Sequence, residues 1–169
     1  KAMVLLNGTM KDMVDTVSTQ KIAHGNMKYV GVIPENVITK LDNLDKAPQS
    51  AVIAVRDDDV LHALRDSKQA KGISLPVEFW EQLPEKLRHP KAILLQAKEQ
   101  QRNKNAGDAL LFVYETEKGK VAVKMDYEVK IKDELSGKKL AHKLNIVRTA
   151  SVVEDFTQLG AFEVLYGSL

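Results

Sequence analysis

One stretch of the sequence decides the fold, Val121-Ala122-Val123-Lys124-Met125-Asp126-Tyr127-Glu128-Val129-Lys130-Ile131-Lys132. Apolar or aromatic side chains occupy every odd position, and every even position except the first is charged. Successive side chains of a β-strand point to opposite faces of the sheet. The stretch therefore predicts a strand with one buried face and one solvent-facing face.

The residues before and after this strand predict two antiparallel neighbours. Residues 109–114 form a continuous apolar run, which is typical of a central strand buried on both faces. Residues 117–120 then provide a hairpin turn. After a second turn at 133–139, residues 140–148 return with Leu140, Leu144 and Ile146 on their apolar side. Three consecutive strands of an antiparallel sheet are thus expected.

The rest of the chain predicts shorter elements. They are strands at 29–33, 51–55, 92–95 and 162–165, and helices within 1–28, at 35–44, at 57–71, from 76 with a kink at Pro84, and from 151. We expect an α+β fold in which N-terminal helices precede an antiparallel β-meander of about four strands and pack on one of its faces. Residues 51–169 are the predicted domain. Because the chain starts at Lys1, we interpret residues 1–50 as a linker or extension from a larger parent protein.

Composition excludes several classes of protein. The chain has no cysteine, which removes disulfide frameworks, thiol nucleophiles and thiolate zinc sites. No apolar run approaches the roughly 20 residues of a membrane-spanning helix, so no membrane partner is expected. None of the four histidines has metal-ligand spacing with another, and no glycine-rich phosphate loop is present. The sequence predicts a soluble protein without a cofactor or a metal.

Charge is distributed unevenly along the chain. Residues 86–148 carry 15 Lys and Arg against 8 Asp and Glu, a balance of +7, although the whole chain has a net charge of only +2. A basic segment is where a phosphate backbone or an acidic partner would bind. An ordinary solvated basic surface explains the same numbers equally well.

A first candidate site lies on the helix that Asp57 begins. Val60, Leu61 and Leu64 form the apolar stripe of this helix. The side chains that project from its other side are those of His62, Arg65, Asp66 and Gln69, and Lys68 lies in its last turns. A histidine beside a fixed arginine can act as a general base next to a cation that holds an anion. A solvated helix face is the simpler interpretation of the same residues.

A second candidate site lies on the polar face of the predicted sheet. Matching apolar faces places Lys124 and Asp126 near Lys143 and Asn145, with Thr149 further along. Lysines held beside hydrogen-bonding groups on a rigid sheet can bind a phosphate chain, although mixed surface charge also serves solubility alone. Arg148 falls on the apolar side at the predicted end of its strand, where it can turn to a site or pair with a carboxylate. Ser151 is expected to cap the next helix, and His142 to be partly buried.

Several blocks of the sequence occur in an order that resembles a known family. The blocks are Asp57-Asp58-Asp59-Val60-Leu61-His62-Ala63-Leu64-Arg65-Asp66, Leu75-Pro76, Leu83-Pro84, His89-Pro90-Lys91-Ala92-Ile93-Leu94-Leu95, Ala109-Leu110-Leu111-Phe112-Val113-Tyr114, Val123-Lys124-Met125-Asp126-Tyr127 and Asn145-Ile146-Val147-Arg148-Thr149-Ala150. Residues 51–169 resemble the C-terminal domain of minor head morphogenesis proteins of Mu-like phages. That group is similar to the barnase–EndoU–colicin–RelE ribonuclease fold.

The resemblance implies a metal-independent ribonuclease-like site on the sheet. His62 would be its base or acid, and Arg65, Lys124 and Arg148 would hold the phosphate. Asp126, Tyr127 and Thr149 would orient the substrate. Lys68, Lys143 and Asn145 would be further substrate-binding residues. The active residues of this family vary, so no single motif shows that a given member is active.

The resemblance leaves three functions open. The first is a ribonuclease-type effector that acts on RNA, including transfer RNA, and is delivered with the virion. The second is a catalytically silent virion module that binds portal, head protein or DNA. The third is a toxin held inactive by a small immunity protein. The expected location is the virion or the bacterial cytoplasm.

Overall fold

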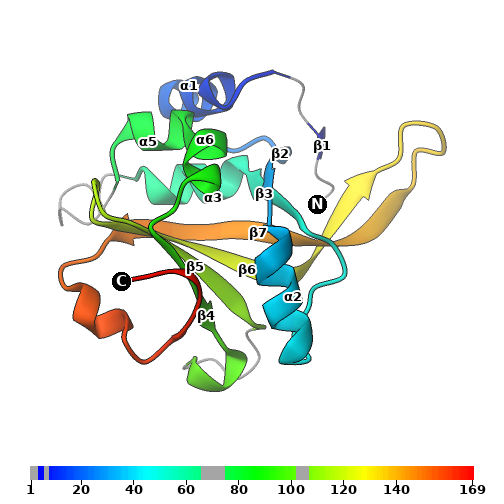
Figure 1. Ribbon diagram of the computed structural model, residues 1–169. Helices are drawn as coiled ribbons and strands as arrows, with labels where there is room; N and C mark the ends of the chain where they lie inside the picture. Colours follow the sequence, from blue (N-terminus) through cyan, green and yellow to red (C-terminus); the bar gives the residue numbers. More distant parts are fainter. Residues whose placement is uncertain (1–3, 6–7, 66–74, 102–106) are drawn as a thin grey trace.

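The computed structural model describes residues 4–5, 8–65, 75–101 and 107–169, which form one eight-stranded sheet with helices packed on it (Figure 1). The strands are β1 (Val4–Leu5), β2 (Asn26–Val32), β3 (Val52–Arg56), β4 (Ala92–Gln96), β5 (Ala109–Tyr114), β6 (Gly119–Lys132), β7 (Lys139–Val152) and β8 (Glu163–Gly167). The helices are α1 (Met10–Gln20), α2 (Glu35–Asn43), α3 (Asp57–Ala63), α5 (Val77–Glu81) and α6 (Leu83–Arg88), with short 3₁₀ turns η1 (Lys98–Gln100) and η2 (Phe156–Leu159). This arrangement confirms the predicted α+β class.

The predicted meander forms the centre of a larger, mixed sheet. The strand order is β1-β2-β3-β7-β6-β5-β4-β8. Strands β4, β5, β6 and β7 pair antiparallel in chain order, as the sequence predicts. Two parallel pairings, of β1 with β2 and of β3 with β7, extend the sheet on one side, and β8 extends it on the other. The other predicted strands thus join the four-stranded meander in one sheet, which is mixed rather than purely antiparallel.

The five helices of the described residues bury their apolar sides on one face of this sheet, as predicted. The main core contains Val14 of α1, Val37 of α2, Val60 of α3, Trp80 of α5 and Leu83 of α6, and these side chains are at most 1% exposed. Burial of aliphatic and aromatic surface on this scale is the main driving force for folding. Residues 10–43 therefore share the core of residues 51–169, rather than lying apart as a linker would. No helix among the described residues has the length and apolar composition needed to span a bilayer.

A smaller apolar cluster covers part of the opposite face. Leu94 and Leu111 of the sheet pack there against Val153, Leu159 and Phe162. The segment that follows β7 passes over this face, on the other side of the sheet from α1, α3, α5 and α6 (Figure 1). It remains strand up to Val152, so the predicted helix cap at Ser151 is wrong, and Asp155 caps η2 instead. This cluster covers the β4 and β5 part of the face, and a third cluster, with Ala54 and Ile146, lies on the part formed by β3 and β7.

A β-bulge at Asp126 divides β6 into two halves that face opposite ways. The Cα register passes from Lys124↔Ile146 to Tyr127↔Leu144, which leaves one extra residue on β6, and Asp126 has φ +54°. An extra residue exchanges the two faces of a strand. Val121, Val123 and Met125 accordingly lie in the main core, whereas Val129 packs against Met27 and Ala54 in the third cluster. The predicted single wet face along the whole strand is wrong.

The bulge has a direct consequence for the polar residues. Before it, Lys124 lies opposite Ile146, which belongs to the cluster on the face away from the helices. After it, Tyr127 lies opposite Leu144 of the same cluster. The bulge therefore brings Lys124 and Tyr127 to one face of the sheet. In a regular strand, residues three positions apart would lie on opposite faces.

We expect Asp126→Val to destabilise the protein by about 1–2 kcal/mol, because a left-handed backbone is costly for a β-branched residue. The change also removes the carboxylate that accepts a hydrogen bond from the Gln49 amide at 2.9 Å. The free energy of unfolding in urea measures this effect. Glu128→Val, at an exposed position of the same strand, is the matched control. Equal stability of the two variants would show that the bulge is unimportant.

Candidate functional site

Four residues meet where β3 runs into α3 beside β7. Arg56 donates from Nε to Oδ2 of Asp59 at 2.8 Å and from Nη2 to Oδ1 at 3.0 Å. Nη1 of Arg148, on β7, lies 3.8 Å from the same carboxylate. The Asp59 side chain is only 6% exposed. A buried carboxylate thus holds Arg56 in the forked geometry that guanidinium groups favour and pairs with Arg148 from a second strand.

Tyr127 completes this arginine cluster, which we define as Arg56, Asp59, Tyr127 and Arg148. Nη1 of Arg148 donates to the Tyr127 hydroxyl at 3.0 Å. The guanidinium carbons of Arg56 and Arg148 each lie 5.0 Å from the centre of the Tyr127 ring, within the range of a cation–π contact. The ring therefore holds both guanidinium groups in place, while the Arg148 side chain stays 37% exposed.

Lys124 adds a third cation beside the cluster. Burial lowers the pKa of its ammonium group, and the charge of Arg148 lowers that pKa further. The ammonium donates to the side-chain oxygen of Gln101. Two arginines thus share the Asp59 carboxylate, and Lys124 lies near Arg148, with Asp108 as the nearest acidic influence on its charge. Positive charge gathered in this way suits an anion.

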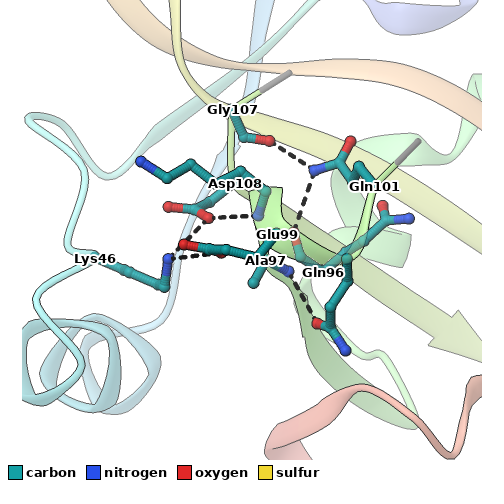
Figure 2. A network of polar contacts seen from close by, with 9 residues as sticks. Lys46, Gln96, Ala97, Glu99, Gln101, Gly107 and Asp108 are labelled. Atoms are coloured by element: carbon teal, nitrogen blue, oxygen red, sulfur yellow. Dashed lines mark hydrogen bonds and ion pairs between the residues drawn. The ribbon is translucent and has the colours of Figure 1, made fainter. Parts of the chain in front are cut away.

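A polar network holds the segment that carries Gln101 (Figure 2). Lys46 pairs with Asp108 at 3.1 Å and with Glu99 at 3.4 Å, which ties the segment after α2 to both ends of the region between β4 and β5. Nε2 of Gln101 donates to the Gly107 carbonyl at 2.7 Å, and this leaves its oxygen for Lys124. The network therefore fixes where the Lys124 ammonium points.

The structure brings together some predicted site residues and separates others. Arg148 and Tyr127 are in direct contact. Arg148 is also close enough to Lys124 for its charge to lower the pKa of Lys124. His62, in the last turn of α3, and Arg65, just after the end of this helix, instead face each other, with Nδ1 and Nη1 3.2 Å apart. Within the described ranges, no hydrogen bond or ion pair joins either of them to Lys124 or Arg148. Lys68 lies outside the described residues.

Helical spacing nevertheless places His62 next to the cluster. Asp59 and His62 are three residues apart in α3, so their side chains leave the same side of the helix. Arg65 lies further on and lines a separate pocket of about 420 Å³ with Val17 and Lys21. His62 thus lies about one helical turn from Asp59 of the arginine cluster and contacts Arg65 of that pocket.

The remaining predicted residues differ in exposure. Asn145 is fully buried, so its expected place on a wet face is wrong; its amide nitrogen donates to the carbonyls of Ser50 at 2.6 Å and Val52 at 2.9 Å. Asp126 accepts from the Gln49 amide in the bulge. Thr149 and Lys143 are exposed on β7. His142, expected to be partly buried, is exposed as well.

Sequence reasoning missed Arg56 and Asp59. The run of three aspartates has a sufficient local explanation as the acidic first turn of a helix, which hides the separate role of Asp59. The available signal is Arg56 three residues before Asp59 at a strand–helix junction. The expectation that Arg148 pairs with a carboxylate is confirmed, but its partner comes from a distant part of the chain.

The arrangement can bind an anion through charge and hydrogen bonding together. Arg148 keeps donors beyond those used by Tyr127 and Asp59, and Lys124 stands beside it. Across the described ranges, no three His, Cys, Asp or Glu side chains gather in a way that could hold a metal ion. No family model, curated protein or solved structure matches the chain, so its chemistry is inferred from this geometry.

Proposed function

We propose that the protein binds RNA at the arginine cluster and Lys124 and cleaves it without a metal ion. The observation that carries this proposal is the pair of partly exposed cations, Arg148 and Lys124, held side by side by Tyr127, Asp59 and Gln101. Preorganised cations at a phosphate stabilise the charge that develops during phosphoryl transfer.

The proposed reaction is an attack by the ribose 2′-oxygen on the adjacent phosphorus. The 2′-oxygen forms a bond to phosphorus, the bond to the 5′-oxygen breaks, and a cyclic phosphate results. Neutral His62 takes the 2′-hydroxyl proton. Protonated Lys124 gives a proton to the leaving 5′-oxygen, and its lowered pKa makes it a stronger acid than an ordinary lysine. Arg148 holds the non-bridging oxygens throughout.

A second candidate is a binding module without catalysis. His62 is already paired with Arg65, which favours this alternative, because a paired imidazole is less available as a base. The setting that we propose for either function is a phage head protein, in the virion or in the bacterial cytoplasm. Portal, head protein or DNA would then be the partner of a silent module, and an immunity protein the partner of a toxin.

The direct test incubates the domain with transfer RNA and with total RNA in the presence of EDTA. The proposal predicts cleavage that leaves cyclic phosphate ends and that is strongly reduced in His62→Ala. Lys139→Gln, which removes an exposed lysine at the start of β7, should cleave like the wild type. RNA binding without cleavage would support the silent module, and neither binding nor cleavage would reject both candidates.

Lys124→Arg separates binding from chemistry. Arginine stays protonated at all relevant pH values, so the variant should retain RNA affinity but lose proton donation and therefore cleavage. Wild-type affinity should fall as pH rises through the pKa of Lys124, below the roughly 10.4 of an ordinary lysine, because the neutral amine no longer attracts phosphate. Affinity measured against pH should show this decline in the wild type and not in Lys124→Arg. Identical profiles would exclude Lys124 from the site.

A further inference from the structure

A small polar pocket lies between α1 and the beginning of α3, apart from the arginine cluster. Its volume is about 140 Å³, which is room for several water molecules. Five oxygen-bearing side chains line it together with the apolar Met13 and Val17, and they are those of Thr9, Asp12, Thr16, Asn26 and Asp57. Histidine does not contribute to its lining, and neither does a lysine or an arginine.

Asp57 contributes a buried carboxylate oxygen that lacks a partner. The residue is 2% exposed, and its Oδ2 accepts a hydrogen bond from the His24 amide at 2.8 Å. Oδ1 has no hydrogen-bond partner among the described residues. A buried polar atom left unsatisfied is costly, more so when it is charged, so such an atom indicates an occupant.

Asp12 supplies a second carboxylate at the same pocket. Hydrogen bonds from Thr9 lower the pKa of Asp12, so this carboxyl is ionised at neutral pH. In the capping box at the start of α1, Oδ2 of Asp12 accepts from the Thr9 amide and Oγ1 of Thr9 accepts from the Asp12 amide, both at 3.1 Å. Oδ1 of Asp12 takes no part in this capping box. The nearby ammonium of Lys28 is bonded to the Gly8 carbonyl, and its charge also contributes to the lowered pKa of Asp12.

We propose that this pocket binds a hydrated divalent cation of the Mg²⁺ or Ca²⁺ type. Two carboxylates, two hydroxyls and an amide form an all-oxygen ligand set, which hard cations prefer. Space for several waters fits an ion that keeps part of its hydration shell and is held by one or two carboxylates. The bound ion links α1 to residue 57, directly after Arg56 of the arginine cluster. Its role is structural and does not depend on RNA cleavage.

The test measures the melting temperature of the whole chain with EDTA, MgCl₂ or CaCl₂, and with NaCl at matched ionic strength. At about 100 times the dissociation constant, the cation should raise the melting temperature by about 5–10 °C. Asp57→Asn should abolish this shift, because the amide can still accept from His24 but cannot replace the second charge. Asp58→Asn makes the same change at the exposed neighbouring residue and should keep the full shift.

Asp12→Asn is the second variant, because its side chain is exposed and its replacement does not disturb the core. It should also lose most of the shift, and it decides the result if Asp57→Asn does not fold. The proposal is overturned if neither divalent ion stabilises the wild type more than NaCl does. An equal shift in the wild type and in both pocket variants would overturn it as well, since the ion would then bind elsewhere.

Discussion

Arg148→Ala is expected to lower the affinity for single-stranded RNA by about 10- to 100-fold, which corresponds to the loss of a charge-assisted hydrogen bond to phosphate. The Arg148 side chain is more exposed than those of Arg56 and Asp59. Tyr127 and Asp59 hold its guanidinium group in place. Its removal should also eliminate about one phosphate contact. The slope of log K against log salt concentration should therefore become less steep by about 0.7, the value per contact for single strands. Fluorescence anisotropy at several KCl concentrations measures both quantities.

Lys139→Ala is the matched control for this variant. Lys139 lies opposite Lys132 on the hairpin of β6 and β7, which continues beyond the rest of the sheet (Figure 1). Lys139→Ala removes one exposed positive charge away from the cluster, and this substitution should change RNA affinity by less than about twofold. If Arg148→Ala and Lys139→Ala weakened binding equally, general surface charge rather than the arginine cluster would account for RNA binding.

Asp59→Ala should destabilise the fold by about 3–5 kcal/mol, the range found when one partner of a buried ion pair is removed. The carboxylate accepts two hydrogen bonds from Arg56 and lies near Arg148, so its loss leaves two guanidinium groups close together without a counter-charge. Urea unfolding of the free protein measures the change. Asp58→Ala, at the adjacent exposed aspartate, should stay within about 0.5 kcal/mol of the wild type.

A double-mutant cycle makes the second prediction specific. In an Arg148→Ala background, Asp59→Ala should cost less than in the wild type, because one of the two uncompensated cations is already gone. A loss below about 1 kcal/mol for the single Asp59→Ala variant would contradict the assigned role of this carboxylate.

Much of the fold could be predicted because it depends on local periodicity. The continuous apolar run of β5 and the alternation of β6 are properties of neighbouring residues, and both strands occur where expected. The bulge at Asp126 could not be predicted in this way. Apolar residues occupy odd positions on both sides of it, so the pattern is unbroken although the strand changes face.

Long-range pairing accounts for the other differences. The parallel pairing of β3 with β7, and the presence of residues 10–43 in the main core, join segments far apart in the sequence. Neither leaves a signal in the local pattern of the segments involved. The predicted helix that begins at Asp57 ends at Ala63, and its predicted last turn falls outside the described residues.

The candidate site was predictable in part. Polarity and position at the end of an apolar stretch drew attention to Arg148, and the expected carboxylate partner exists. The resemblance groups Lys124 and Tyr127 with Arg148, yet Lys124 and Tyr127 share a face only through the bulge. Arg56 could not be assigned to the site from the sequence. Its salt bridge with Asp59 is local to the start of α3, and its contact with Tyr127 exists only in the folded sheet.

The central claim is that phosphate binds between Arg148 and Lys124, at the arginine cluster. The most direct measurement is an NMR titration of the isotope-labelled protein with inorganic phosphate and then with a short single-stranded RNA. We predict that the largest shifts occur at Arg148, Tyr127 and Lys124 with both ligands, and that Arg148→Ala removes them. Shifts confined to the hairpin lysines, or to the pocket lined by Arg65, would contradict the claim.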